Sequence, residues 1–248
     1  MSLRGQTALV TGAGKRIGEA VALALGEAGV NIVTHYRQSA GRAEGLRDLL
    51  RRRGVQAFCI QADFEKLDEV DSLIDRARAE AGPIDILVNN ASEFRAETIE
   101  ALTHASFQRD LDINAWTPFA LTRAFARQAS QGKVINFLDA QIAGYDRAHA
   151  GYILSKHLLA TLTRMTALQY APGLTVNAVA PGLILPPEGK DESYLLQLAK
   201  RVPLQRHGGL VDITRTVLFL LESEFVTGQV VFVDGGQHLA GGDRWTGS

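Results

Sequence analysis

The sequence predicts an α/β fold: one doubly wound domain over residues 1–248, with a seven-stranded parallel sheet and helices on both faces. Strand-like and helix-like segments alternate along the whole chain. Several strand-like segments are almost continuously apolar, which is typical of parallel strands covered on both faces. No repeat, linker or low-complexity tract divides the chain, and a hydrophobic content of 46% suffices for one sizeable core.

The elements follow one another in regular order. The predicted strands are the runs at residues 7–10, 31–34, 57–60, 84–88, 133–137, 174–179 and 229–233. The predicted helices lie between them, at residues 17–28, 40–53, 67–81, 104–130, 151–171 and 211–222. Glycines suited to a helix C-terminus follow four of these segments; they are Gly29, Gly54, Gly82 and Gly173.

The longest poorly patterned stretch lies at about residues 181–207. It holds Pro181, Pro186, Pro187 and Pro203 around a short helical piece. A segment of this length without regular structure is commonly functional, so we interpret it as a substrate loop or lid over the site.

Composition excludes several classes of function. The formal net charge is −1, so no overall basic field attracts nucleic acid. The sequence contains no apolar run of about 18 residues that would span a membrane, and no leader pattern at its start. Three histidines, His149, His157 and His207, lack metal-ligand spacing, so no metal site is predicted. The sequence therefore predicts a cytoplasmic protein that acts on a small molecule and binds neither nucleic acid nor membrane.

A glycine-rich segment, Val10–Gly18, follows the first predicted strand and opens the first predicted helix. Glycine lets the backbone approach a pyrophosphate, and the helix N-terminus stabilises the negative charge. This context favours a dinucleotide site over a glycine-rich turn without a ligand.

The end of the second predicted strand reads His35-Tyr36-Arg37 and has no carboxylate. A carboxylate there would bond the 2′-hydroxyl of the ribose and favour NAD. Arg37, with Lys15 and Arg16 nearby, suits a 2′-phosphate instead, so the predicted cofactor is NADPH. The alternative is that Arg37 is a surface cation.

Tyr152 and Lys156 lie four residues apart in a predicted helix, and Asp139 precedes the tyrosine by thirteen residues. Positions i and i+4 share one helix face. A nearby ammonium favours the phenolate, so we expect Lys156 to lower the pKa of Tyr152 and to make its hydroxyl a proton donor near neutral pH. The alternative is a solvated helix face without chemistry.

Together these motifs resemble the short-chain dehydrogenase/reductase family over essentially the whole chain. The matching residues, in order, are Thr11-Gly12, Gly18, Asp63, Asn89-Asn90-Ala91, Asn114, Tyr152, Lys156, Pro181-Gly182 and Val233-Asp234-Gly235-Gly236. The resemblance implies a Rossmann-type fold in which the cofactor supplies hydride and the protein supplies position and a proton.

Three features resemble the pteridine reductase subgroup. The nucleotide loop carries Lys15-Arg16, with Arg16 where the wider family has its middle glycine. His35-Tyr36 is followed by Ser39-Ala40, and Asp139 stands where the wider family has its catalytic serine. The run Asn89–Phe94 is a further match. Two positions depart from the expected patterns: Pro186 replaces a threonine that helps to hold the nicotinamide amide, and Glu93 lies beside the expected pterin shelf.

The resemblance implies a role for each site residue. Tyr152 would donate the proton, Lys156 would bond the nicotinamide ribose, and Asn114, at a kink in the central helix, would hold a water that links Lys156 to bulk solvent. The residues expected to contact the cofactor are Gly12, Lys15, Arg16, Ile17, His35, Tyr36, Arg37, Asp63, Phe64, Asn90, Ala91, Ser92, Tyr152, Lys156, Pro181, Gly182 and Ile184. The residues expected to contact the substrate are Arg16, Ser92, Phe94, Asp139 and Tyr152.

The chemistry of Asp139 separates the possible substrates. An ionised carboxylate only accepts hydrogen bonds, so it suits an N–H or amino group and repels a carbonyl oxygen. Phe94 suits a flat heterocycle, which it would stack against the nicotinamide. These two residues favour reduction of a C=N bond. The alternative for Asp139 is a helix cap at a site whose activity is lost or altered.

The leading hypothesis is an NADPH-dependent reductase of a pterin or dihydrofolate-like substrate. The alternatives are a carbonyl reductase acting on a ketone, sugar or 3-oxoacyl thioester, and a nucleotide-binding sensor without turnover. The family resemblance implies a homotetramer in which the helices at 104–130 and 151–171 pair across a two-fold axis. The tail at residues 241–245 ends in Trp245, which would close over the pocket or a neighbouring subunit, or be disordered.

Overall fold

One parallel sheet organises the molecule, with strand order β3-β2-β1-β4-β5-β6-β7. The computed structural model describes residues 2–187 and 189–240. The strands are β1 Thr7–Val10, β2 Asn31–Tyr36, β3 Ala57–Gln61, β4 Ile86–Asn89, β5 Gly132–Phe137, β6 Leu174–Pro181 and β7 Val230–Val233. The predicted α/β class and the seven-stranded parallel sheet are confirmed.

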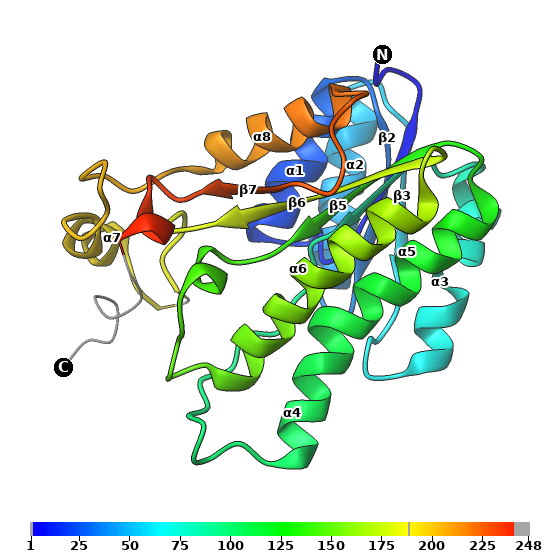
Figure 1. Cartoon of the computed structure of the whole chain (residues 1–248). Helices are drawn as coiled ribbons and strands as arrows, with labels where there is room; N and C mark the ends of the chain where they lie inside the picture. Colours follow the sequence, from blue (N-terminus) through cyan, green and yellow to red (C-terminus); the bar gives the residue numbers. More distant parts are fainter. Residues whose placement is uncertain (1, 188, 241–248) are drawn as a thin grey trace.

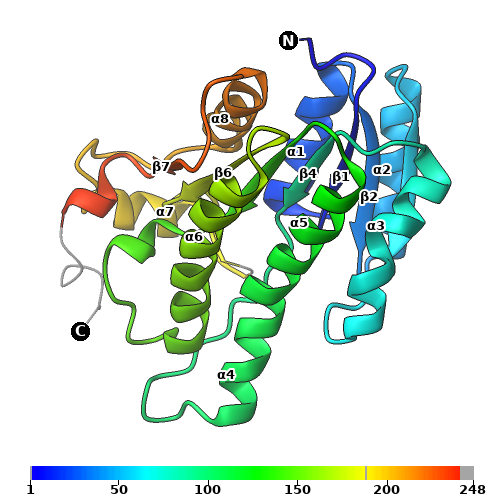
Figure 2. The same cartoon turned by 45° about the vertical axis from the view of Figure 1, so that its right-hand side comes forward.

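Helices cover both faces of the sheet (Figures 1 and 2). They are α1 Arg16–Glu27, α2 Ala40–Arg52, α3 Leu67–Ala81, α4 His104–Leu111, α5 Thr117–Gln128, α6 Ala150–Tyr170, α7 Glu192–Ala199 and α8 Leu210–Glu222. Short 3₁₀ turns follow β5 and β7; they are η2 Ala140–Ala143 and η3 Gln237–Leu239.

Alternating residues of the central strand β1 pack in two hydrophobic clusters, one on each face of the sheet. On one face, Val10 of β1 packs in a cluster with residues of α1, α2 and α8, such as Leu25 and Leu50. On the other face, its neighbour Leu9 packs with residues of α3 and α5, such as Phe125. Both strand residues are fully buried, so β1 reads as a continuous apolar run in the sequence, as expected for a strand covered on two sides.

The central strand positions the site. β1 pairs with β2 on one side and with β4 on the other, so the chain reverses direction across the sheet between β3 and β4. In open parallel sheets a ligand cavity forms at such a switch point, beyond the carboxyl ends of the strands. The segments after β1, β4 and β5 therefore meet at one edge.

The predicted central helix at 104–130 is interrupted. Residues Asp112–Trp116 form a π-helical turn, η1, between α4 and α5. Asn114 lies inside this turn and is fully buried, so the expected kink is present at the expected residue. Such single-turn π bulges are frequent at functional sites.

The remaining differences are small shifts of boundaries. β2 extends to Tyr36, which places His35 and Tyr36 within a strand rather than after it. The short helical piece predicted within residues 181–207 is present as helix α7, Glu192–Ala199. The predictions for the tail at 241–245 lie outside the described residues. Within the part of the chain that the structure describes, no helix is long and apolar enough to cross a membrane.

Candidate active site

The nucleotide loop between β1 and α1 is packed against the segment that follows β4. Gly12 has a φ of +63°, and a Cβ added there would lie 2.9 Å from the Cα atom of Ala91. A Cβ at Gly18 would lie 2.5 Å from the Nδ2 atom of Asn90. These close approaches require glycine at both positions. Arg16, where the wider family has glycine, adopts the left-handed region with a φ of 57°.

Side-chain hydrogen bonds join the same two segments. The Oγ1 atom of Thr11 accepts hydrogen bonds from the backbone N–H groups of Asn90, at 2.9 Å, and Ala91, at 3.0 Å. The Nδ2 group of Asn90 donates to the Thr11 carbonyl at 2.9 Å. Asn90, a predicted cofactor contact, thus uses its amide to position the backbone that lines the cavity.

His35 holds the loop from beneath. The backbone N–H of Gly12 donates to Nδ1 of His35 at 3.1 Å, which leaves Nε2 to donate to the Ala62 carbonyl at 3.0 Å. The ring stacks on Phe64 with centroids 4.4 Å apart. Burial lowers the pKa of His35 to about 4, so the imidazole is neutral at physiological pH. The sequence suggested a contact with the cofactor; the structure shows a residue that also fixes the position of Gly12.

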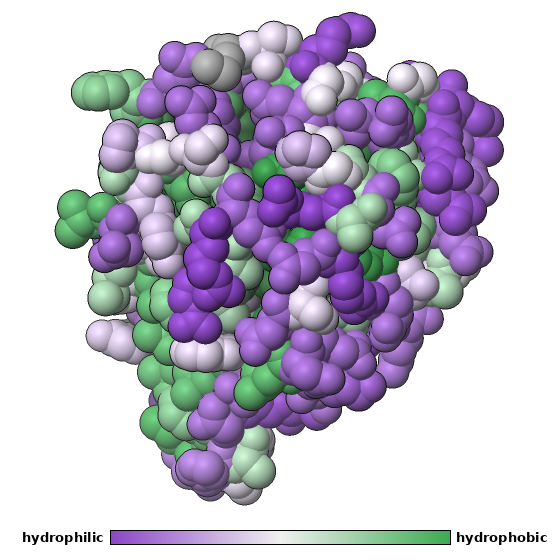
Figure 3. All heavy atoms as spheres, turned by 90° about the vertical axis from the view of Figure 1, so that its right-hand side faces the viewer, coloured by the Kyte–Doolittle hydropathy of each residue, from purple (hydrophilic) through white to green (hydrophobic). Residues whose placement is uncertain are grey.

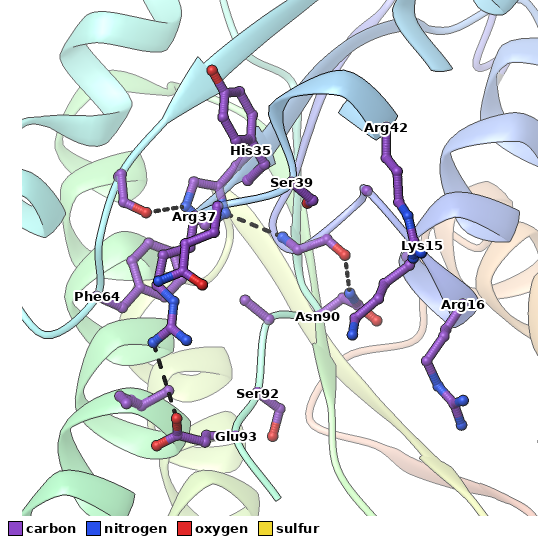
Figure 4. A pocket seen from close by; sticks show the side chains of 18 of the residues that line it. Lys15, Arg16, His35, Arg37, Ser39, Arg42, Phe64, Asn90, Ser92 and Glu93 are labelled. Carbon is purple, nitrogen blue, oxygen red and sulfur yellow. Dashed lines mark hydrogen bonds and ion pairs between the residues drawn. The ribbon is translucent and has the colours of Figure 1, made fainter. Parts of the chain in front are cut away.

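A cavity of about 990 Å³ lies beside this loop (Figure 4). Twelve of the predicted cofactor contacts line it: Gly12, Lys15, Arg16, Ile17, His35, Tyr36, Arg37, Asp63, Phe64, Asn90, Ala91 and Ser92. Sequence reasoning did not select Ser39, Arg42 and Glu65 as site residues, although they line the same cavity. The other predicted contacts lie elsewhere: Gly182 lines a second cavity, and Ile184 is 4% exposed and packs in the core.

Arg37, predicted to face a 2′-phosphate, is paired with a carboxylate. Its Nη1 atom lies 3.0 Å from Oε1 of Glu65 and 4.0 Å from Oε1 of Glu93. Figure 4 shows the side chain turned toward Glu93 and away from Lys15 and Arg42. The cation is therefore in the predicted cavity, but its charge is already balanced by glutamates.

The catalytic candidates meet at the start of α6. The hydroxyl of Tyr152 donates to Oδ2 of Asp139 at 3.0 Å, and the backbone N–H of Gln141 donates to Oδ1 of Asp139 at 2.8 Å. Burial raises the pKa of Asp139, although both hydrogen bonds and Lys156 act in the opposite direction. The structure thus brings together a phenol and a carboxylate that are 13 residues apart in the sequence.

The predicted acidification of Tyr152 is wrong for this arrangement. Burial and the adjacent Asp139 carboxylate raise the pKa of Tyr152 well above its usual value. Lys156 does not offset this rise; its Nζ atom lies 5.6 Å from the centre of the tyrosine ring. The sequence pattern correctly indicated proximity on one helix face, but it gave no measure of burial, which opposes the charged phenolate.

Lys156 is itself deeply buried, with 2% of its surface exposed. Its Nζ group donates to the Phe137 carbonyl at 2.9 Å. Burial lowers the pKa of Lys156 to about 8, against the opposing effect of Asp139. The ammonium is held at the carboxyl end of β5, on the same helix face as Tyr152.

Asn114 has contacts that the sequence did not suggest. Its Oδ1 atom accepts from the Ser92 hydroxyl at 2.8 Å and from the Glu93 backbone N–H at 2.9 Å. Its Nδ2 group donates to the Glu93 carbonyl at 3.0 Å. Asn114 therefore fixes the segment that carries Ser92 and Phe94, while its expected link to Lys156 through water stays a prediction.

A second cavity, of about 750 Å³, contains Asp139 and Phe94 in its wall. Phe94 is 54% exposed, stacks on His149 with centroids 4.0 Å apart, and presents an edge-to-face contact to Tyr152 at 4.7 Å. Of the predicted substrate contacts, Phe94 and Asp139 line this cavity and Tyr152 contacts both of them, whereas Arg16 and Ser92 line the nucleotide cavity. Arg16 also donates to the Pro186 carbonyl at 3.0 Å, which ties the nucleotide loop to the segment 181–207.

Comparisons with known proteins agree with this geometry. A family model described as enoyl-(acyl carrier protein) reductase matches residues 12–238. A Staphylococcus epidermidis protein named 3-oxoacyl-(acyl-carrier-protein) reductase FabG is 33% identical over 243 residues, which cover 94% of this chain and 99% of that protein. The chain belongs to the short-chain dehydrogenase/reductase family. Membership supports an oxidoreductase and the predicted family-wide motifs.

Solved structures of family members are also similar. The FolM alternative dihydrofolate reductase 1 from Brucella canis, complexed with NADP, has a TM-score of 0.91 and is 33% identical, with 96% of each chain covered. The corresponding Brucella suis protein, also in complex with NADP, has the same TM-score and identity. The relatives therefore carry two different substrate names at equal identity, so the assignment of a substrate depends on the site itself.

Proposed function

We propose that this short-chain reductase uses NADPH to reduce a pterin or dihydrofolate-like substrate. The observation that carries the proposal is the hydrogen bond, 3.0 Å long, from the hydroxyl of Tyr152 to Asp139, which lines the second cavity. The wider family has a serine at the position of Asp139, and a serine hydroxyl donates to a carbonyl oxygen. A carboxylate reverses that preference, since it accepts from N–H groups.

The side chains around Asp139 fit a flat nitrogen heterocycle. Phe94 is 54% exposed, stacks on His149 and makes an edge contact with Tyr152, and stacked or edge contacts of this kind suit planar rings. Burial and the Asp139 carboxylate raise the pKa of Tyr152, so its hydroxyl carries the proton at neutral pH. The raised pKa makes Tyr152 a weaker acid than the sequence predicted, so we assign the proton transfer to a ring nitrogen from position: Asp139 orients the hydroxyl that donates it.

NADPH, when bound, supplies the hydride to the carbon of the C=N bond. The residues present fit its nucleotide portion: the glycine-rich loop approaches closely, α1 presents its N-terminus, and Lys15, Arg37 and Arg42 line the cavity. The NADP complexes of the two Brucella proteins support the same cofactor.

The second candidate is reduction of a 3-oxoacyl thioester. The names of the 33% identical Staphylococcus relatives and the description of the family model favour it. Against it stands Asp139, because an ionised carboxylate repels the carbonyl oxygen on which negative charge develops during ketone reduction.

Steady-state kinetics with purified enzyme separate the two candidates. Consumption of NADPH would be followed by absorbance with dihydrobiopterin, dihydrofolate or an acetoacetyl thioester as substrate. We expect kcat/KM to be at least ten-fold higher for a pteridine than for the thioester. The reverse order would replace the proposal by the second candidate, and NADPH binding without turnover of any of these substrates would favour a sensor.

We also propose a homotetramer. Apolar side chains remain exposed along η1 and α6: Trp116 at 42%, Leu154 at 43%, Leu158 at 42%, Met165 at 60% and Leu168 at 84%. Figure 3 shows a largely hydrophilic face with hydrophobic residues gathered toward its left edge. Exposed apolar surface of this kind marks association sites. Light scattering of the purified protein should give four times the chain mass, 26.8 kDa, and a monomer would contradict the proposal.

A further inference from the structure

A chain of ion pairs runs along the wall of the nucleotide cavity. Arg37 contacts Glu65 at 3.0 Å, and Glu65 in turn accepts two hydrogen bonds from Arg109, at 2.7 and 2.8 Å. Arg109 also bonds both carboxylate oxygens of Glu93, at 2.6 and 3.0 Å. Glu65 is thus anchored by a bidentate guanidinium and cannot leave Arg37 without breaking that contact.

Glu65 lies beside Arg37, where a carboxylate can affect the preference between NADPH and NADH. The sequence has no acidic residue directly after β2, and this absence predicts a 2′-phosphate at the end of the strand. In the folded chain, Glu65 from the segment after β3 lies against Arg37 at the end of β2. Both side chains line the nucleotide cavity, with 39% and 40% of their surfaces exposed.

We propose that Glu65 sets the preference between NADPH and NADH by competing with the 2′-phosphate for Arg37. A phosphate that pairs with Arg37 lies close to the anchored Glu65 carboxylate and is repelled by it. The preference for NADPH is therefore smaller than Arg37 alone would provide. This inference rests on the proposed use of NADPH, and it assigns to Glu65 a role in specificity rather than in catalysis.

The charges beside Arg37 set the expected magnitude. The groups near its guanidinium are Glu65 and Glu93, and Arg109 partly neutralises both carboxylates. Because Arg37 and Glu65 are partly exposed, solvent weakens their interaction with a phosphate. Removal of the Glu65 charge should therefore lower the Kd of NADPH by about five-fold and leave the Kd of NADH within about two-fold.

Equilibrium titration of the full-length enzyme, followed by nicotinamide fluorescence, tests this inference. The variants are Glu65→Gln, Glu65→Asp, Arg37→Ala and the control Asp48→Asn. Asp48 forms a partly buried pair with Arg47 at 2.8 Å on α2, and neither residue lines the nucleotide cavity. Only Glu65→Gln should raise the preference for NADPH, whereas Arg37→Ala should lower it. The charge-conserving Glu65→Asp should stay within about two-fold of the wild type.

The possible outcomes distinguish a failure of the role of Glu65 from a failure of the proposed cofactor or substrate. An unchanged or lower preference for NADPH in Glu65→Gln would overturn the role of Glu65, and so would an equal rise in Glu65→Asp, since size rather than charge would then decide. A wild-type enzyme that does not bind NADPH would overturn the proposed cofactor instead. A raised preference in Glu65→Gln, together with failure to reduce any pteridine, would leave the role of Glu65 standing and reject the proposed substrate.

Discussion

The glycine-rich loop at the nucleotide end of the site is held by hydrogen bonds between uncharged groups, such as those from Gly12 to His35 and from Asn90 to Thr11. At the catalytic end, three titratable side chains, Asp139, Tyr152 and Lys156, are enclosed together. The first arrangement agrees with the rule that buried polar groups are paired. In the second arrangement the pKa values of the three side chains differ from their ordinary values, which is typical of functional sites.

The lowered pKa of Lys156 shows that the catalytic end reduces the stability of the folded protein. Its pKa falls from 10.5 to about 8 on burial, so the folded protein binds this proton less tightly than the unfolded chain does. This group therefore lowers stability as the pH falls from 10.5 toward 8, and the full loss persists at neutral pH. The glycine-rich loop at the nucleotide end is fixed by neutral hydrogen bonds, whereas the catalytic end gives up stability to keep an ammonium beside the reacting groups.

The largest expected effect comes from Tyr152→Phe. Loss of the hydroxyl removes the proton donor and leaves Asp139 with one hydrogen bond fewer. We expect kcat to fall about a thousand-fold, in the range of general acid catalysis, while the Kd of NADPH changes less than about two-fold. Stopped-flow and fluorescence titration would measure both quantities. Retention of more than a tenth of wild-type turnover would remove Tyr152 from its assigned role.

A second change tests the specificity of the catalytic end. Asp139→Ser restores the residue type of the wider family beside Tyr152. We expect kcat/KM for dihydrobiopterin to fall about a hundred-fold and that for an acetoacetyl thioester to rise, because the hydroxyl donates to a carbonyl and the carboxylate does not. Asp139→Asn is the matched variant that keeps the shape and an acceptor oxygen. An equal loss for both substrates in Asp139→Ser would show that Asp139 does not discriminate between them.

A third change tests the close packing of the glycine-rich loop at the nucleotide end. Gly18→Ala would bring a Cβ to 2.5 Å from the Gly12 carbonyl oxygen as well as from Asn90. Such overpacking costs about 1–3 kcal/mol of stability and should raise the Kd of NADPH about ten-fold. Chemical denaturation and titration would measure the two effects. Gly45→Ala on α2, where no atom lies within 4 Å of the added Cβ, is the control and should not weaken NADPH binding. Equal behaviour of the two variants would contradict the close packing of the loop.

Local signals in the sequence were sufficient to predict the helices and strands and most of the residues that line the nucleotide cavity. The glycines of the loop, the apolar strands and the Tyr152–Lys156 spacing each report on neighbouring residues. The partner of Arg37 was not predictable in this way, since Glu65 is 28 positions away and reaches it only through the pairing of β2 with β3. The prediction of a lowered pKa for Tyr152 was wrong for a related reason. That pKa depends on burial by the whole fold and on Asp139, and not on the lysine four residues along.

The smallest expected effect is the pH dependence that His35 gives to the nucleotide end. Its pKa is about 4 in the folded protein and 6.5 without burial, so the unfolded chain binds the proton more tightly. The contribution of the neutral imidazole is complete above pH 6.5 and is lost as the pH falls toward 4. We expect the free energy of unfolding to fall by about 0.7 kcal/mol from pH 7 to 6 and by about 2 kcal/mol from pH 7 to 5 through this residue.

Urea denaturation at pH 7, 6 and 5 would measure this contribution as the difference in slope between the wild type and His35→Gln. His104→Gln is the control, because His104 is exposed at the start of α4. Its profile should follow that of the wild type, whereas His35→Gln should be less stable at pH 7 but flatter toward pH 5. Parallel profiles for the wild type and His35→Gln would show that His35 gains its proton without disturbing Gly12. The contrast between a glycine-rich loop held by neutral groups and a charged catalytic end would then fail at His35, the residue on which it most directly depends.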